Sequence, residues 1–102
     1  MIDLIEQHRA GLEELCRTYR VKTLEVFGSA ADGTFDPARS DLDFLVQFAP
    51  LGPRQHYECY FGLLESLQAL FGRPIDLVEA DAMRNPYFIR GVQASRRLLY
   101  AA

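Results

Sequence analysis

The chain has 102 residues, of which 49% are hydrophobic and 25% charged, and a formal net charge of −3 at pH 7. This length suits one domain with a modest core, and the acidic balance argues against tight binding of a polynucleotide, whose phosphates attract basic surfaces. No apolar run approaches the roughly 20 residues of a membrane span, and the N-terminus lacks the basic start of a signal peptide. We therefore expect a cytoplasmic protein, in which Cys16 and Cys59 are reduced core thiols.

The first predicted element is an amphipathic helix from Ile2 to Tyr19, because apolar residues recur there at steps of three and four. Its apolar stripe consists of Ile2, Ile5, His8, Leu12, Leu15 and Tyr19. A single histidine on such a stripe is more often a packed residue than a catalytic base or a ligand, so no role is assigned to it.

The second element is a strand from Val21 to Phe27, rich in β-branched and other apolar residues. It ends at Gly28, where the backbone can turn sharply or approach a ligand closely. Ser29 can then cap a short helical turn closed by Gly33. Capping alone would explain Ser29, but it is compatible with phosphate binding, since both use N–H groups that are free at a helix start.

A pair of carboxylates opens the next strand, Asp41 to Phe48, after an exposed turn at residues 34–40. Asp41 and Asp43 are two residues apart and share one face of the strand, where like charges repel unless a cation lies between them. In the alternative interpretation, Asp41 caps a turn and Asp43 pairs with an arginine. Metal binding is favoured, because Asp43 is flanked by core residues on its face of the strand. Arg39, just before the carboxylates, can point into solvent or touch phosphate.

A second helix follows the loop at residues 49–54 and ends at Gly72 and Pro74. Its stripe, expected to belong to the core, consists of Tyr57, Tyr60, Phe61, Leu64, Leu67 and Phe71. Aromatic residues at this spacing are core residues far more often than they form a platform for base stacking.

The third predicted strand, Ile75 to Glu79, carries Asp76 among apolar residues, which is costly for an isolated charge. A cation shared with the two earlier carboxylates would account for Asp76, and a salt bridge to an arginine such as Arg73 is the competing explanation. We expect the metal site to comprise Asp41, Asp43 and Asp76.

The last predicted element is a helix that Asn85 caps, with Pro86 at its first position, and that reaches about Tyr100. Its apolar side comprises Phe88, Ile89, Val92, Leu98 and Leu99, and its arginines are read as a solvated face.

The order of elements predicts an α/β domain spanning residues 1–102. The first two strands, joined by a short turn, are expected to pair antiparallel in a small mixed sheet of about three strands packed by helices.

Residues 28–33, Gly-Ser-Ala-Ala-Asp-Gly, and residues 40–46, Ser-Asp-Leu-Asp-Phe-Leu-Val, resemble the G-S-x-A-x-G and S-D-x-D-hydrophobic signature of the DNA polymerase beta-like nucleotidyltransferases. Within that superfamily the short chain is similar to the minimal nucleotidyltransferase (MNT) family. Either motif alone is weak, but both in this order, at strand edges and with a later strand aspartate, are specific. Asp32 departs from the pattern, because relatives commonly carry a basic residue there; Arg39 or Arg54 would have to compensate for it.

The resemblance implies an enzyme that transfers a nucleoside monophosphate from a triphosphate. Asp41, Asp43 and Asp76 would hold two Mg²⁺ ions, with Asp76 nearest the acceptor hydroxyl as metal ligand or general base. Gly28 and Ser29, with Arg39 as a further candidate, would hold the triphosphate of ATP.

The MNT resemblance also implies a partner, since members of this family commonly pair with a helical HEPN toxin and act as its antitoxin. The first hypothesis is an adenylyltransferase that moves AMP from ATP onto a tyrosine of such a toxin. The second is a weak or inactive antitoxin that neutralises its partner by binding alone. The third is a small-molecule, aminoglycoside-like transferase whose pocket needs a partner subunit. No stable nucleic-acid or membrane partner is expected.

Overall fold

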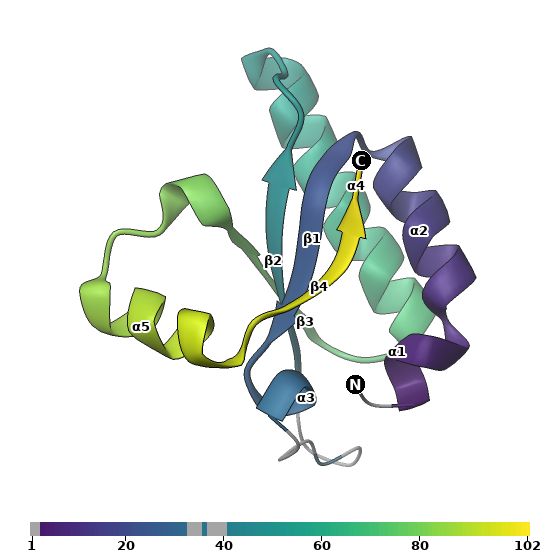
Figure 1. The fold of residues 1–102 in the computed structure, drawn as a ribbon. Coiled ribbons are helices and arrows are strands. Elements are labelled where there is room, and N and C mark those ends of the chain that lie inside the picture. Colours follow the sequence, from purple (N-terminus) through teal and green to yellow (C-terminus); the bar gives the residue numbers. More distant parts are fainter. Residues whose placement is uncertain (1–2, 33–35, 37–40) are drawn as a thin grey trace.

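The computed structural model describes residues 3–32, 36 and 41–102 (Figure 1). Its elements, in chain order, are α1 (Asp3–Gln7), α2 (Arg9–Thr18), β1 (Val21–Phe27), α3 (Ser29–Asp32), β2 (Leu42–Phe48), α4 (Pro53–Phe71), β3 (Ile75–Glu79), the 3₁₀ turn η1 (Ala80–Ala82), α5 (Pro86–Ser95) and β4 (Arg97–Ala101). The predicted α/β class with a mixed sheet is confirmed. The sheet has four strands in the order β3-β2-β1-β4, with β1 antiparallel to β2 and β4, and β2 parallel to β3.

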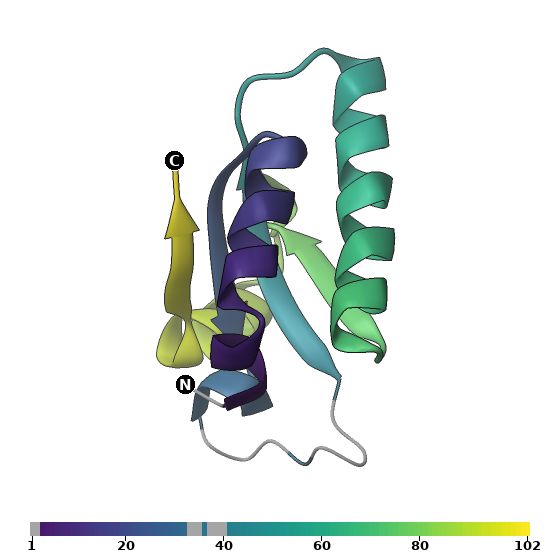
Figure 2. The same cartoon turned by 90° about the vertical axis from the view of Figure 1, so that its right-hand side faces the viewer.

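The sheet separates two layers of unequal size (Figure 2). One face packs against α1, α2 and α4 and buries the main core. Buried on this side are Ile5, Leu12, Cys16, Leu24, Val26, Leu42, Phe44, Val46, Leu63, Leu67 and Phe71, among others. On the opposite face, the buried cluster formed by the described residues is small and comprises Phe27 and Leu45 of the sheet and Val92 of α5. Residues that alternate along β2 therefore face a thick layer on one side and a thin one on the other.

The predicted first helix is interrupted at His8, which separates α1 from α2. The N–H of His8 bonds to the carbonyl of Ile5 three residues back, at 3.1 Å, and this tighter turn breaks the regular spacing. The His8 ring lies against Phe71, with the ring centroids 5.2 Å apart, and its Nδ1 is 2.9 Å from the carbonyl oxygen of Leu4. This packed histidine agrees with the expectation from the sequence.

The prediction that the final helix continues to Tyr100 is wrong beyond Ser95. The chain leaves the helix at Arg96 and forms β4, whose residues pair with β1 along its free side. Leu99 is buried, whereas Leu98 is 55% exposed, which is the alternation of a strand. This fourth strand is the reason that the predicted count of about three is too low.

The predicted stripe of α4 is also partly wrong. Leu67 and Phe71 are buried, together with Leu63, which is not in the predicted stripe. Tyr57 and Phe61, expected in the core, are 66% and 43% exposed. The helix ends at Gly72 as predicted, with the left-handed φ of 63° that favours glycine.

Each edge strand of the sheet accepts a hydrogen bond from a helix side chain. The hydroxyl of Tyr60 in α4 donates to the carbonyl of Leu77 in β3 at 2.6 Å. The guanidinium of Arg9 in α2 donates to the carbonyl of Leu99 in β4 at 2.8 Å. Since an open strand edge invites pairing with another chain, these bonds protect both borders. None of the described helices has the length and apolar character needed to cross a bilayer.

Candidate functional site

The centre of the candidate site is the contact between Gly28 and Asp43. Gly28 follows β1 with a φ of +70°, a conformation that glycine adopts at little cost. Asp43 is the second residue of β2 and pairs with Phe27, the residue before the glycine. A Cβ built on Gly28 would lie 2.5 Å from Oδ2 of Asp43. The carboxylate therefore fills the space that any larger residue at position 28 would need.

Asp76 lies beside Asp43 on the neighbouring strand. The two residues are partners in the parallel pairing of β2 with β3, where paired residues lie about 5 Å apart. They share the face of the sheet toward α5, because Leu45 and Val78, two residues further along each strand, both pack there. Asp41 directly precedes β2. The topology thus brings the three predicted carboxylates to one end of two adjacent strands.

The electrostatic coupling of the three carboxylates is visible in Asp43. Its pKa is raised to about 6, first by burial and then by the negative charges of Asp76 and Asp41. Each effect disfavours the ionised form of Asp43. A bound cation would reverse both effects, since it would neutralise the repulsion and replace lost water ligands.

Asp76 is more exposed than its apolar sequence neighbours led us to expect. Asp43 is half-buried, whereas Asp41 and Asp76 are exposed. The predicted cost of placing Asp76 among apolar residues is therefore not present, because β3 is an edge strand and its second residue reaches solvent. Carboxylate oxygens are the ligands that Mg²⁺ prefers, so the donor set fits this ion. Across the described ranges, no three His, Cys, Asp or Glu side chains are gathered closely enough to hold a metal ion without rearrangement.

A residue that the sequence did not single out, Ser95, ties the glycine corner to α5. Its hydroxyl accepts a hydrogen bond from the N–H of Gly28 at 2.9 Å and lies 3.4 Å from the carbonyl of Gly91. Ser95 is only 9% exposed, and it is the last residue of α5. A serine near the end of a helical pattern gives no sequence signal for such a long-range contact.

Of the other residues predicted to bind the nucleotide, the structure describes Ser29 but not Arg39. Ser29 is the first residue of α3, and the N–H of Ala31 bonds to the carbonyl of Gly28 at 3.0 Å, which forms the predicted short turn. Arg39 lies outside the described residues. Arg54, suggested as a compensating cation, is the second residue of α4, at the other end of the sheet, and pairs with Glu58 at 3.3 Å. It therefore does not stand beside the glycine corner.

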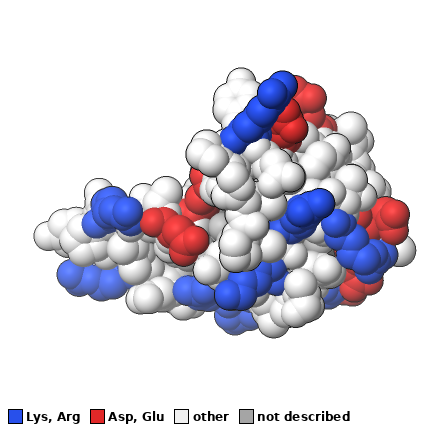
Figure 3. Space-filling view, turned by 90° about the horizontal axis from the view of Figure 1, so that it is seen from above, with Lys and Arg blue, Asp and Glu red and all other residues white. Residues whose placement is uncertain are grey.

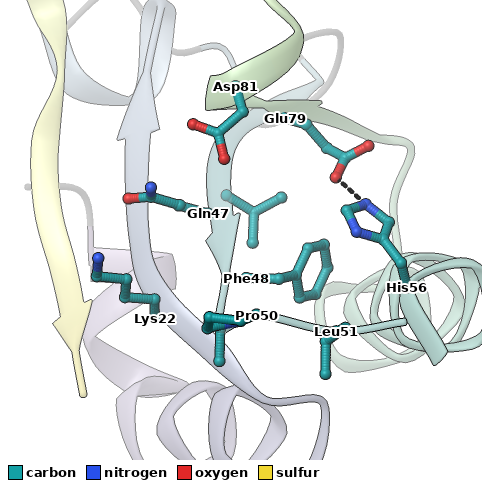
Figure 4. Close-up of a pocket in the computed structure, with 10 residues that line it drawn as sticks. Lys22, Gln47, Phe48, Pro50, Leu51, His56, Glu79 and Asp81 are labelled. Carbon is teal, nitrogen blue, oxygen red and sulfur yellow. Dashed lines mark hydrogen bonds and ion pairs between the residues drawn. The ribbon is translucent and has the colours of Figure 1, made fainter. Parts of the chain in front are cut away.

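A pocket of about 340 Å³ lies at the far end of β2, away from Asp43 (Figure 4). Its apolar lining includes Val46, Phe48 and Leu51, and its polar rim includes Lys22, Gln47 and Asp81. A hydrogen bond joins Nε2 of His56 and Oε1 of Glu79 across one side of it. No predicted site residue lines this pocket. The predicted chemistry thus lies on the open strand end rather than in this hollow.

Three comparisons with known proteins identify the family and the fold of the chain. The family model described as nucleotidyltransferase domain matches residues 8–99. A proposed protein adenylyltransferase of Methanocaldococcus jannaschii is 33% identical over 91 residues, which cover 89% of this chain and 86% of that protein.

Two solved structures share the fold. A proposed minimal nucleotidyltransferase superposes with a TM-score of 0.67 and 26% identity, covering 94% of this chain and 95% of the other. An MNT antitoxin in complex with a tri-AMPylated HEPN toxin, from Shewanella oneidensis, gives a TM-score of 0.63 with 18% identity, over 95% of this chain and 72% of the other. At this lower identity the likeness concerns the fold alone.

Proposed function

We propose that this chain, which belongs to the nucleotidyltransferase domain family and is an enzyme of that type, transfers AMP from ATP to a hydroxyl of a protein. The hydroxyl oxygen would bond to the α-phosphorus, and the bond to the β-phosphate would break, which releases pyrophosphate. The observation that carries the proposal is the contact of Gly28 with Asp43, beside Asp76 on the next strand. It sets the turn that starts α3 next to carboxylates that repel one another. The N–H groups of such a turn suit phosphate oxygens, and such carboxylates suit divalent cations.

The chain's own residues would act in three ways. The turn at Gly28 and Ser29 would hold the triphosphate and orient it for in-line attack, with the N–H of Gly28 donating to Ser95 and so fixing the turn rather than binding phosphate itself. Asp41 and Asp43 would bind the cation at the strand end, and the cation would bind the phosphates. Asp76, exposed on the edge strand, would face the acceptor hydroxyl and take up its proton or help to orient it. When bound by these residues, Mg²⁺ supplies neutralisation of the charge that develops on the phosphate oxygens.

The acceptor we propose is a tyrosine of a HEPN-type toxin, which makes the chain an antitoxin. The M. jannaschii relative is named for protein adenylylation, and the Shewanella neighbour of the same fold is bound to an AMPylated HEPN toxin. The catalytic strand end is also exposed, with Asp41 and Asp76 open to solvent, so a macromolecule can approach it.

Transfer of label tests the proposal. The purified chain is incubated with ATP labelled at the α-phosphate, Mg²⁺ and the protein encoded by the adjacent gene. Label is expected on that protein with the wild-type chain and is expected to be lost with Asp43→Asn. Asp81→Asn is the matched control, since Asp81 is an exposed carboxylate in η1 at the other end of β3. Absence of transfer by the wild-type chain, or full transfer by Asp43→Asn, would refute the proposed activity.

A second candidate, an antitoxin that acts by binding alone, is favoured by one observation. The carboxylates of the described residues do not form a ready three-ligand group for a metal. Protection of cells from the adjacent gene product that persists undiminished in Asp43→Asn would support this candidate instead.

A further inference from the structure

Seven of the ten residues of α5 are exposed, against four of the ten in α2, and the exposed side of α5 is both aromatic and cationic. Only Val92 and Ser95 of its ten residues are buried. Tyr87 is 78% exposed and Phe88 is 40% exposed.

The C-terminal segment, residues 82–102, has the opposite charge to the chain as a whole. After Asp81 the sequence has four arginines and no acidic residue, whereas the whole chain carries −3. Arg96 pairs with Glu25 at 2.5 Å, but neither Arg84 nor Arg90 forms an ion pair with any carboxylate in the described part of the chain. Figure 3 shows blue, basic side chains toward the outer end of the projecting segment that contains α5, next to red carboxylates nearer the body of the domain. The Arg84 guanidinium donates through Nη1 to the carbonyls of Asp81 and Met83, and Arg90 lies over the Tyr87 ring, so neither positive charge is neutralised by a carboxylate of the described residues.

The α5 surface also adjoins the catalytic strand end. The ring of Phe88 lies edge-on to that of Phe27, with centroids 6.0 Å apart. Phe27 precedes Gly28 and pairs with Asp43. Arg90 lies over the ring of Tyr87, with its Cζ 5.3 Å from the centroid. Tyrosine and arginine are the residues that most often dominate the energetics of protein interfaces.

We infer that Arg84, Tyr87, Phe88 and Arg90, together called the α5 patch, bind an acidic surface of the acceptor protein. This inference rests on the proposed function, because it assigns the docking surface for that acceptor. Bound there, the acceptor lies beside the carboxylates, and its hydroxyl can enter the strand end. A polynucleotide fits less well, because its phosphates would meet Asp41, Asp43 and Asp76 next to the patch.

Binding of the purified adjacent-gene product to the chain, measured by biolayer interferometry, tests the α5 patch. The double charge reversal Arg84→Glu/Arg90→Glu and the single variant Tyr87→Ala are each expected to raise Kd about tenfold or more. Wild-type affinity is expected to fall as salt rises from about 50 mM to about 500 mM, because charge pairs at an interface are screened.

Two variants outside the patch serve as matched controls. Arg17→Glu reverses one exposed arginine of α2, which is half the charge change of the double variant. Tyr57→Ala removes an exposed tyrosine of α4. Both are expected to bind within about twofold of the wild-type chain. Should the charge reversal impair folding, as shown by circular dichroism, Tyr87→Ala decides the question, since that ring is mostly solvated.

The outcomes separate this inference from the proposed function. Label transfer to the adjacent-gene product, together with equal binding by patch and control variants, would overturn the α5 patch and leave the transferase standing. Patch-dependent binding without any label transfer would refute the transferase and leave the patch. Patch-dependent binding of a single-stranded RNA of about 20 nucleotides, with no binding of the protein, would overturn the inference.

Discussion

The backbone of Gly28 and the carboxylate of Asp43 touch so closely that a single methyl group on the glycine would overlap Oδ2, at 2.5 Å. The φ of +70° at Gly28 adds a second reason for glycine at this position. Sterics and backbone conformation therefore fix the distance between the turn and the carboxylate.

Gly28→Ala should consequently lower both stability and activity. We expect a loss of about 1–3 kcal/mol from the left-handed backbone conformation, together with displacement of Asp43. Thermal unfolding and label transfer measure the two effects. Gly91→Ala is the control, because a Cβ added at Gly91 would meet no atom within 4 Å and alanine favours helix. Equal stability of the two variants would show that the contact imposes no constraint.

The raised pKa of Asp43 predicts how stability depends on pH. The folded pKa of about 6 exceeds the ordinary value of 3.8, so the folded state binds the proton more tightly. This contribution to stability is complete below about pH 4 and is lost as pH rises to about 6. Above that pH, Asp43→Asn should therefore be more stable than the wild-type chain, on the order of 1 kcal/mol after allowance for solvent screening.

Denaturant unfolding of both proteins between about pH 4 and about pH 8 measures this difference. The gap in the free energy of unfolding should close toward the acidic end. An Asp43→Asn variant that is less stable than the wild-type chain at neutral pH would contradict the assignment of repulsion to this carboxylate.

Ligand binding should stabilise the folded chain through the same carboxylates. With Mg²⁺ and AMP-PNP at about 100 times Kd, the free energy of unfolding should rise by about 2.7 kcal/mol. The expected increase in Tm should be absent in Asp43→Asn and retained in Asp81→Asn. A rise in Tm that requires neither Mg²⁺ nor Asp43 would place the nucleotide elsewhere.

Ser95→Ala should weaken nucleotide binding by releasing the glycine corner. The N–H of Gly28 would lose its acceptor, at a cost of about 1 kcal/mol. We expect a higher KM for ATP, with recovery in Ser95→Thr, which keeps the hydroxyl. Ser66→Ala is the control, because the Ser66 hydroxyl lies 3.2 Å from that of Tyr19, between α4 and α2. If both variants change stability alone, Ser95 has no positioning role.

The sequence was sufficient to predict the part of the fold that holds the candidate site. β1 begins and ends where its β-branched residues and Gly28 indicate, and β2 begins one residue after the predicted Asp41. The short link between these strands correctly implied antiparallel pairing. We placed Asp76 beside Asp43 by assuming that the third strand joins the same sheet. In the structure β3 pairs with β2, and the register sets Asp76 opposite Asp43.

The errors arise where packing between distant segments decides the structure. Leu98, Leu99 and Tyr100 continue the apolar pattern of α5, and only the free side of β1 turns them into a strand. Tyr57 and Phe61 have helical spacing, but the sheet covers the neighbouring stripe through Leu63. The bond from Gly28 to Ser95 joins residues 67 positions apart, which no local pattern encodes.

The most direct test of the account is a crystal structure of the chain with Mn²⁺ and AMP-PNP, in which anomalous scattering locates the metal. The account predicts a peak at the ends of β2 and β3, ligated by oxygens of Asp43 with Asp41 or Asp76, and phosphates at the Gly28–Ser29 turn. Metal held by the nucleotide alone, with Asp43 and Asp76 unligated, would contradict it.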